Sequence, residues 1–330
     1  MTLPGFATPI PESVPPRPAA QVRTARVIMG LGLLGAFLPL VWADSIGLWG
    51  AGAAQWLLPV ALLLAGGAAI EIVAILFHRG LAPRLPVLVA GCVAVPLAAA
   101  LGNPAFRSAA AGGPPLASAG WAAATAVAVM MGAFVVEMWL YRVGGGAIER
   151  LAGTALGLLA VALPLGFLVS LRLTGTPTYD GGWHRPGMLP LVAMIAAVKF
   201  GDVLAYLVGS TIGRRRMAPA LSPGKTWEGA AGALVGALVA SWIVLIPLRG
   251  LLTPADGGAA GPWGGWVVHG LLVGSAGMLG DLAESLLKRE AGVKDSGATL
   301  GALGGGLDLV DSLLFAAPTA WLLWVNSYPS

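Results

Sequence analysis

Charged residues are scarce in this chain of 330 residues: they make up 10% of the sequence, whereas a soluble domain is about 25% charged. Hydrophobic residues account for 57%, and the mean hydropathy is +0.83. Water is therefore not the main solvent of this protein, and the composition predicts an all-α, polytopic integral membrane bundle. The 49 glycines predict helices that pack closely through small residues.

Cysteine is almost absent. The single Cys92 excludes an intramolecular disulfide and leaves no thiolate cluster for zinc. The formal net charge of +4 is too diluted by apolar residues to indicate nucleic-acid binding. Residues 1–24 are Pro-rich and polar, and they lack the basic start, apolar run and cleavage site of a signal peptide. We expect these residues to form a disordered tail.

Long apolar runs dominate the rest of the chain. A membrane-spanning helix needs about 20 mostly apolar residues, and about nine segments meet this description, of which the first and third are short: 27–43, 52–77, 85–101, 119–141, 151–171, 187–209, 229–248, 264–287 and 300–325. We interpret residues 25–186 as scaffold helices that could form an oligomer interface. Residues 187–330 then form the region that carries the chemistry.

The basic residues predict the orientation of these spans. With the N-terminus in the cytoplasm, fourteen of the 19 lysines and arginines fall in inner segments. Because cytoplasmic loops are enriched in Lys and Arg, this asymmetry predicts a cytoplasmic N-terminus in a cell membrane. Nine spans would then place the C-terminus outside.

Four aspartates interrupt the last spans: Asp202, Asp281, Asp308 and Asp311. Ionisable groups inside a membrane are costly and commonly functional. In this topology each lies about 7–12 residues from the cytoplasmic end of its helix, a depth of roughly 10–18 Å. The similar depths predict one polar cavity that opens to the cytoplasm.

The spacing of the polar residues supports a shared face on each of two helices. Asp281, Glu284, Ser285 and Lys288 follow an i, i+3, i+4, i+7 pattern, and Asp308 begins an i, i+3, i+4 pattern with Asp311 and Ser312.

Closely packed carboxylates would repel one another unless a divalent cation neutralised them. Oxygen ligands favour Mg²⁺ or Mn²⁺ over zinc, and a second, monovalent cation is left open. As an alternative, the acids could pair with Lys199, Lys288 or Arg289 and fix helix packing. Glu71 and Glu137, isolated on earlier spans, are expected to be packing or interfacial groups.

A loop with a Gly-Lys-Thr sequence precedes the seventh span. Gly224-Lys225-Thr226 resembles the end of a P-loop, but Pro219 stands where that pattern needs glycine and no buried strand is visible before it. The P-loop interpretation therefore fails.

A helix start is the interpretation that remains for this loop. Ser222 is predicted to be the N-cap, with Pro223 at the first helical position. Free N–H groups and Lys225 would then point at one phosphate, although ordinary capping beside a positive-inside charge is an equal alternative. The arginines 214–216 would be an interfacial anchor that could also hold an anionic lipid headgroup.

Together these elements resemble the phosphatidate cytidylyltransferase (CDP-diacylglycerol synthase) family over roughly residues 195–320. The matching motifs are Asp202-Val-Leu-Ala-Tyr206, Ser222-Pro-Gly-Lys225-Thr226-Trp227-Glu-Gly229, Ser285-Leu-Leu-Lys288-Arg289, Lys294-Asp295-Ser-Gly297, Gly304-Gly305 and Asp308-Leu-Val-Asp311-Ser312.

The resemblance implies transfer of a cytidylyl group from CTP to phosphatidic acid with Mg²⁺, giving CDP-diacylglycerol and pyrophosphate. It implies that Asp281, Asp308 and Asp311 bind metal, with Asp202 as a further candidate. It also implies that the triphosphate or the lipid phosphate is bound by Lys225, Lys288, Arg289 and Lys294, with Ser222 and Ser285 as hydrogen-bond donors. The further substrate-site residues would be Thr226, Asp295 and Tyr206. A homodimer in the cytoplasmic membrane is expected, with the active site facing the cytoplasm.

Two departures from the family pattern stand out. Leu303 replaces a histidine in the glycine-rich turn, and Leu309 replaces an arginine between the paired aspartates. Attack by an already anionic lipid phosphate needs no general base, so loss of the histidine need not end activity. Lys199, three residues before Asp202, could replace the arginine.

Other functions stay open from the sequence alone. Intramembrane carboxylates also serve cation- or proton-coupled transporters, but the outer halves of spans six to nine lack matching acids. The remaining alternatives are another CTP-dependent lipid enzyme, such as an archaeal-lipid cytidylyltransferase or a polyprenol kinase, and a catalytically degenerate family member.

Overall fold

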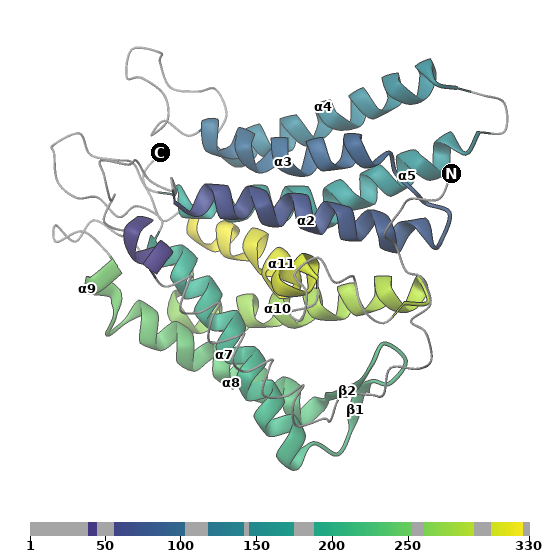
Figure 1. The fold of residues 1–330 in the computed structure, drawn as a ribbon. Helices are drawn as coiled ribbons and strands as arrows, with labels where there is room; N and C mark the ends of the chain where they lie inside the picture. Colours follow the sequence, from purple (N-terminus) through teal and green to yellow (C-terminus); the bar gives the residue numbers. More distant parts are fainter. Residues whose placement is uncertain are drawn as a thin grey trace, which may run out of the picture.

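The computed structural model describes residues 39–44, 56–102, 118–141, 145–174, 188–252, 261–293 and 305–325. Within these ranges the chain is almost entirely helical (Figure 1). The helices are α2 (Leu57–Phe77), α3 (Leu85–Leu101), α4 (Ser118–Trp139), α5 (Ala147–Gly157), η4 (Leu158–Ala162), α6 (Leu163–Arg172), α7 (Met188–Ile212), α8 (Trp227–Leu245), α9 (Arg249–Leu252), α10 (Gly265–Glu290) and α11 (Gly306–Trp324).

Seven helices in the described ranges are long and apolar enough to cross a membrane, and α3 is a shorter apolar helix. One of the seven is the continuous helix Ala147–Arg172, in which η4 is a single π-helical turn ahead of Pro164. A π turn adjusts the hydrogen-bonding pattern of a helix, and here it precedes a proline that cannot donate. The predicted all-α class is confirmed, and this is a multi-pass membrane protein.

The first predicted span, 27–43, and the tail at 1–24 lie mostly or wholly outside the described residues. The total of nine spans and the orientation of the N-terminus stay predictions.

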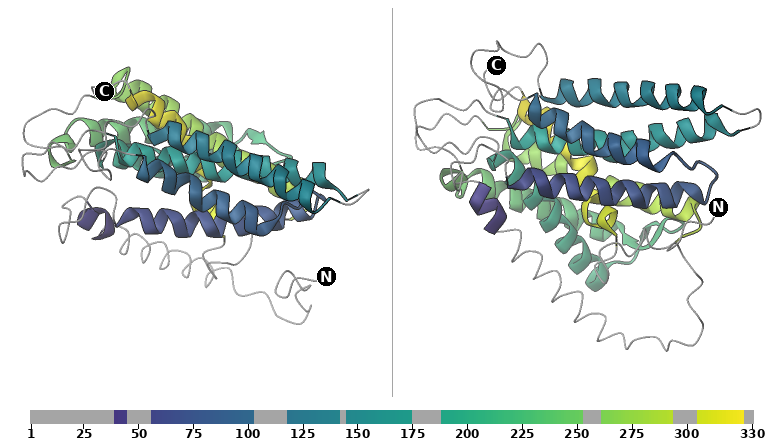
Figure 2. Two further views of the ribbon diagram at one scale, coloured as in Figure 1. Left: turned by 90° about the horizontal axis from the view of Figure 1, so that it is seen from above. Right: turned by 45° about the horizontal axis from the view of Figure 1, so that its top comes forward.

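Two groups of helices make up the bundle. Helices α2 to α6 lie together, and α7 and α8 run at an angle to them, with α10 and α11 between the two groups (Figures 1 and 2). Helix α11 contacts α2, α6, α7 and α10, so it is the central element. A hairpin of β1 (Arg216–Ala218) and β2 (Ser222–Thr226) connects α7 to α8.

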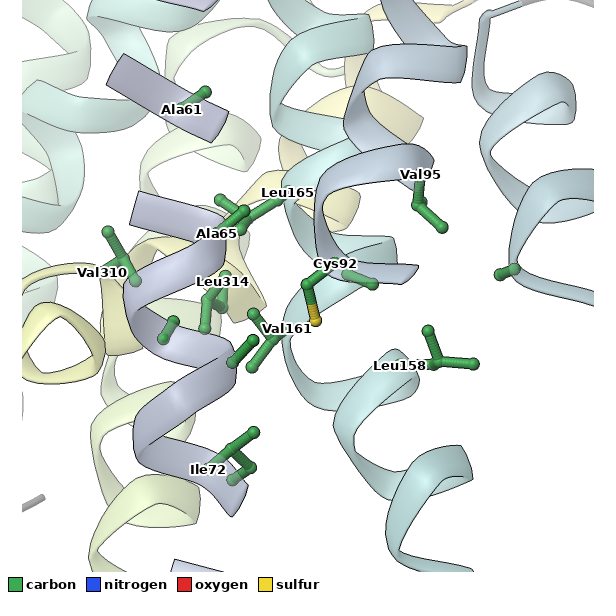
Figure 3. Close-up of a cluster of buried hydrophobic side chains, with 14 of the residues drawn as sticks. Ala61, Ala65, Ile72, Cys92, Val95, Leu158, Val161, Leu165, Val310 and Leu314 are labelled. Atoms are coloured by element: carbon green, nitrogen blue, oxygen red, sulfur yellow. The ribbon is translucent and has the colours of Figure 1, made fainter. Parts of the chain in front are cut away.

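Each group has its own apolar core. The first joins α2, α3, η4, α6 and α11, and Ile72, Cys92, Val161, Leu165 and Leu314 belong to this cluster (Figure 3). The second joins α7, α8, α10 and α11 around the fully buried Trp324. Because α11 contributes to both cores, its position depends on the N-terminal helices as well as on the C-terminal ones.

Glycines allow α7 and α8 to pack with their backbones close together. A Cβ at Gly236 would lie 2.6 Å from the carbonyl oxygen of Phe200, and one at Gly232 would lie 3.0 Å from that of Leu204. A Cβ at Gly229, one turn earlier on α8, would lie 3.0 Å from the carbonyl oxygen of Ala205. The composition predicted packing through small residues, and this face of α8 confirms it.

Candidate functional site

A cavity of about 260 Å³ lies between α7, α8, α10 and the hairpin. Its polar and apolar walls include Asp202, Tyr206, Lys225, Thr226, Met278 and Asp281. Each of the three helices and β2 supplies part of the lining, so residues spread over 80 positions of the sequence meet here. Its volume is far greater than that of two other cavities in the described residues, which measure about 20 and 30 Å³.

Two ion pairs set the electrostatics of this cavity. The Nζ atom of Lys225 lies 2.7 Å from Oδ2 of Asp281, and their side chains are 24% and 39% exposed. Lys199 Nζ lies 3.6 Å from Oδ2 of Asp202, which confirms that these two α7 residues share a face. The side chains of both lysines and both aspartates are partly exposed. Each lysine can therefore leave its aspartate for a phosphate without leaving a fully buried, unpaired carboxylate behind.

The hairpin, rather than a helix start, presents Lys225. Ser222 and Pro223 belong to β2, and α8 begins at Trp227 with Thr226 as its N-cap. Thr226 Oγ1 accepts a hydrogen bond of 3.0 Å from the N–H of Gly229. The prediction of Ser222 as the N-cap was therefore wrong.

The physical reason lies in the pairing of β2 with β1. Arg216 is opposite Thr226 in the antiparallel ladder, and Trp227 N donates to the carbonyl of Arg215. These backbone bonds keep residues 222–226 extended. Thr226, the next residue with a capping hydroxyl, then takes the role expected of Ser222.

Contacts with α8 and α10 hold the hairpin in place. The carboxylate of Glu228 accepts from the backbone N–H groups of Arg214 and Arg215, at 3.1 and 3.2 Å. Arg289 Nε donates to the carbonyl of Leu221 over 3.2 Å. Arg289 thus fixes the turn of the hairpin, and the side chains of arginines 214–216 stay exposed.

A second polar cluster lies between α10 and α11. Lys288 Nζ is 3.0 Å from Oε1 of Glu284 and also binds Asp308. Glu284 is 8% exposed. Asp311 lies beside Glu284 and accepts a 2.8 Å hydrogen bond from the hydroxyl of Ser312. A cavity of about 30 Å³ between α2, α10 and α11 is lined by Glu284 and Asp311.

The structure thus divides the four predicted aspartates. Asp202 and Asp281 line the main cavity, whereas Asp308 and Asp311 belong to the neighbouring cluster. The two sites adjoin, because Asp281 and Glu284 are one turn apart on α10 and Asp202 interacts electrostatically with both Asp281 and Asp311. Gly280 permits this close approach: a Cβ there would lie 2.6 Å from the carbonyl oxygen of Asp311.

No three histidine, cysteine, aspartate or glutamate side chains converge on one point in the described ranges in a way that could hold a metal ion. Magnesium, however, is commonly bound by one or two carboxylates together with substrate phosphates and water. The half-exposed oxygens of Asp202 and Asp281 fit that mode, and the donor chemistry is that of a hard cation.

The other residues singled out from the sequence lie outside the main cavity or outside the described ranges. Ser285 is half-buried on α10. Leu309 packs against the first apolar core, away from the main cavity. Lys294, Asp295 and Leu303 lie outside the described residues.

Two further carboxylates, Glu284 and Glu71, make contacts that were not predicted from the sequence. Glu284 was assigned to the polar face of its helix but not to the site, although its i, i+4 spacing to Lys288 signalled the ion pair that forms. Glu71 was correctly expected to be a packing group. Its partner, the start of α11, is 235 residues away and has no local sequence signal.

The sequence was compared with models of known protein families. Residues 24–326 match the model of the cytidylyltransferase family. The chain therefore belongs to that family.

Curated relatives resemble parts of the chain. It is 38% identical over 137 residues to a phosphatidate cytidylyltransferase of Haemophilus influenzae, covering 41% of this chain and 46% of that one. It is 30% identical over 212 residues to a phosphatidate cytidylyltransferase of Synechocystis, covering 60% of each. An uncharacterized Escherichia coli protein, YnbB, is 41% identical over 132 residues, 40% of this chain and 41% of that one. The chain thus spans about half the length of the curated relatives it matches.

Proposed function

We propose that this protein transfers a cytidylyl group from CTP to phosphatidate, giving CDP-diacylglycerol and pyrophosphate. The observation that carries the proposal is the main cavity at the junction of three membrane helices, where Lys225 pairs with Asp281 and Asp202 also lines the wall. Membership of the cytidylyltransferase family and the similarity to phosphatidate cytidylyltransferases support the same substrates.

In the proposed reaction an oxygen of the lipid phosphate attacks the α-phosphorus of CTP. A new P–O bond forms there, and the bond from the α-phosphorus to the oxygen that bridges it to the β-phosphorus breaks, so pyrophosphate leaves with that electron pair. The nucleophile is already anionic and needs no base. The barrier comes from repulsion between two polyanions, which fixed cations reduce.

The residues of this chain divide that task. Lys225 would leave Asp281 for the triphosphate, and Thr226, beside it in the cavity wall, would add a hydroxyl donor. Lys288 would hold the side chains of Asp308 and Glu284 in place through its ion pairs at the adjoining cluster. Ser222, Ser285, Arg289, Lys294 and Asp295 remain candidate phosphate-site residues on the strength of the family motifs.

Magnesium is the cofactor we propose. Asp281 and Asp202 would hold it together with the phosphates of CTP, and Asp308 and Asp311 are the further candidate ligands. When bound, the ion would neutralise charge on the leaving pyrophosphate.

Access from the bilayer and from water is needed, because one substrate is a lipid and the other is polar. Tyr206 lines the cavity and is 62% exposed, and the apolar neighbours Val203 and Leu207 on α7 are also exposed. The lipid would enter along this face of α7. We place the hairpin and its arginines at the cytoplasmic side of the cell membrane, where CTP is available.

A homodimer is the assembly we propose, through α4 at the edge of the bundle. Ala124, Ala128 and Gly132 are exposed and recur every four residues along this helix, a spacing that lets membrane helices approach closely.

The test is an assay of purified protein in lipid nanodiscs with labelled CTP, Mg²⁺ and phosphatidate. Asp281→Asn should lower formation of CDP-lipid by about a hundredfold or more. Glu290→Gln is the matched control: the same chemical change on the same helix, at a residue that pairs with Arg79 away from the cavity. Absence of CDP-lipid with the wild-type protein would refute the proposal, and equal activities of the two variants would refute the role of Asp281.

A further inference from the structure

Helix α11 begins inside the bundle. Gly305, Gly306 and Leu307 are all buried, and Gly306 lies against Gly67 and Ala68 in the middle of α2. Ala68 is nine residues from the end of α2 at Phe77, which corresponds to roughly 14 Å along the helix axis. Figure 1 shows α11 (yellow) beginning well within the bundle, between α2 and α10.

A buried helix start creates a problem of unpaired backbone groups. The first N–H groups of a helix have no partner within it, and inside a membrane protein no bulk water replaces that partner. Each such group must find an acceptor, or its burial costs free energy.

Glu71 of α2 provides the acceptors. Its Oε1 accepts a 2.8 Å hydrogen bond from the N–H of Gly306, and its Oε2 accepts one of 2.8 Å from the N–H of Leu307. The Glu71 side chain is buried, with 2% of the residue exposed. The preceding N–H, on Gly305, donates to Asp308 over 3.1 Å. Two carboxylates from different helices thus bind three consecutive N–H groups.

The same turn of α11 carries the second polar cluster. Asp308 lies within it and Asp311 follows one turn later, and both lie beside Glu284 on α10. A shift of this turn would move Asp308 relative to Lys288, with which it is paired.

We infer that Glu71 is a positioning residue: it fixes the first turn of α11 and thereby places Asp308 and Asp311 against α10. This assigns a task in the site to the N-terminal helices, which supply no side chain to the main cavity in the described ranges. Its effect on turnover rests on the function proposed above, but the contact itself does not.

The test uses Glu71→Gln in the full-length protein, with two readouts. Glutamine keeps the shape but offers one acceptor oxygen and turns an N–H₂ group towards a backbone donor. We expect amide hydrogen exchange in residues 305–311 to accelerate by roughly tenfold or more. We also expect kcat to fall by roughly tenfold or more, while KM for CTP changes less than about threefold, because the cavity with Lys225 is untouched.

Glu137→Gln is the matched control, since Glu137 is equally buried but binds Arg84 and Arg150. It should leave exchange in 305–311 and kcat unchanged. If Glu71→Gln does not fold, Glu71→Asp keeps the charge, withdraws it by one methylene, and is measured in the same way. The inference would be overturned if amide hydrogen exchange in residues 305–311 kept its wild-type rate in the Glu71 variants. It would also be overturned if Glu137→Gln lowered kcat as much as Glu71→Gln. An inactive wild type would defeat the proposed reaction alone, and the exchange data would still decide on Glu71.

Discussion

Lysine side chains occupy the positions next to the acidic groups of the site. Lys225 is bound to Asp281, Lys288 to Glu284 and Asp308, and Lys199 lies near Asp202. The sequence allowed two interpretations of these acids, as metal ligands or as ion-pair partners, and the structure shows the ion pairs. The two are compatible at Asp281 and Asp202, whose pairs with Lys225 and Lys199 are partly exposed. Exposed pairs contribute only about 0–1 kcal/mol each, so a phosphate or a metal can replace one partner.

Lys199 provides a residue-scale prediction, because it is the candidate substitute for the arginine replaced by Leu309. Its ammonium group is 3.6 Å from Asp202 and its side chain is 43% exposed, so it can turn towards a bound phosphate. Lys199→Met should abolish CDP-lipid formation and leave expression intact, as measured by turnover and by yield from the membrane fraction. Near-normal turnover in this variant would reject the substitution hypothesis.

The hairpin and α8 show where an element could and could not be predicted. The apolar run predicted a helix over 229–248, and α8 covers most of it. The local residues Ser222 and Pro223 also suit a helix start, but strand pairing across residues 216–226 decides their conformation. Such pairing depends on a partner strand of three residues, which is too short to give a periodic signal.

The glycine face of α8 provides an element-scale prediction. In Gly236→Ala the new methyl group would meet the carbonyl oxygen of Phe200 at 2.6 Å, so α7 and α8 must separate. Overpacking of this kind costs about 1–3 kcal/mol, and we expect a lower Tm and reduced turnover.

The matched control for this variant is Gly66→Ala on α2, where a Cβ would meet nothing within 4 Å. Its Tm should stay at or slightly above that of the wild type, because alanine favours a helix over glycine. A Gly236→Ala protein as stable as Gly66→Ala would show that the α7–α8 contact tolerates a side chain.

At the scale of the whole molecule, the membrane fold and the region of the site follow from simple sequence signals. Apolar length predicts the spans, and the four intramembrane aspartates lie on α7, α10 and α11. The division of the acids into two adjoining clusters could not be predicted, because it depends on the rotation of α7, α10 and α11 about their axes. Close contacts between helices, such as that of Gly280 with the backbone of Asp311, fix those rotations. The role of Glu71 depends likewise on where α11 begins.

The fate of the phosphates of CTP tests the central claim most directly. Purified protein in phosphatidate-containing nanodiscs would receive CTP labelled either on the α-phosphorus or on the γ-phosphorus. The account predicts that the α label enters the lipid and the γ label leaves as pyrophosphate, because attack occurs at the α-phosphorus. Entry of the γ label into lipid would indicate a kinase, and label in neither lipid nor pyrophosphate would contradict the proposed reaction.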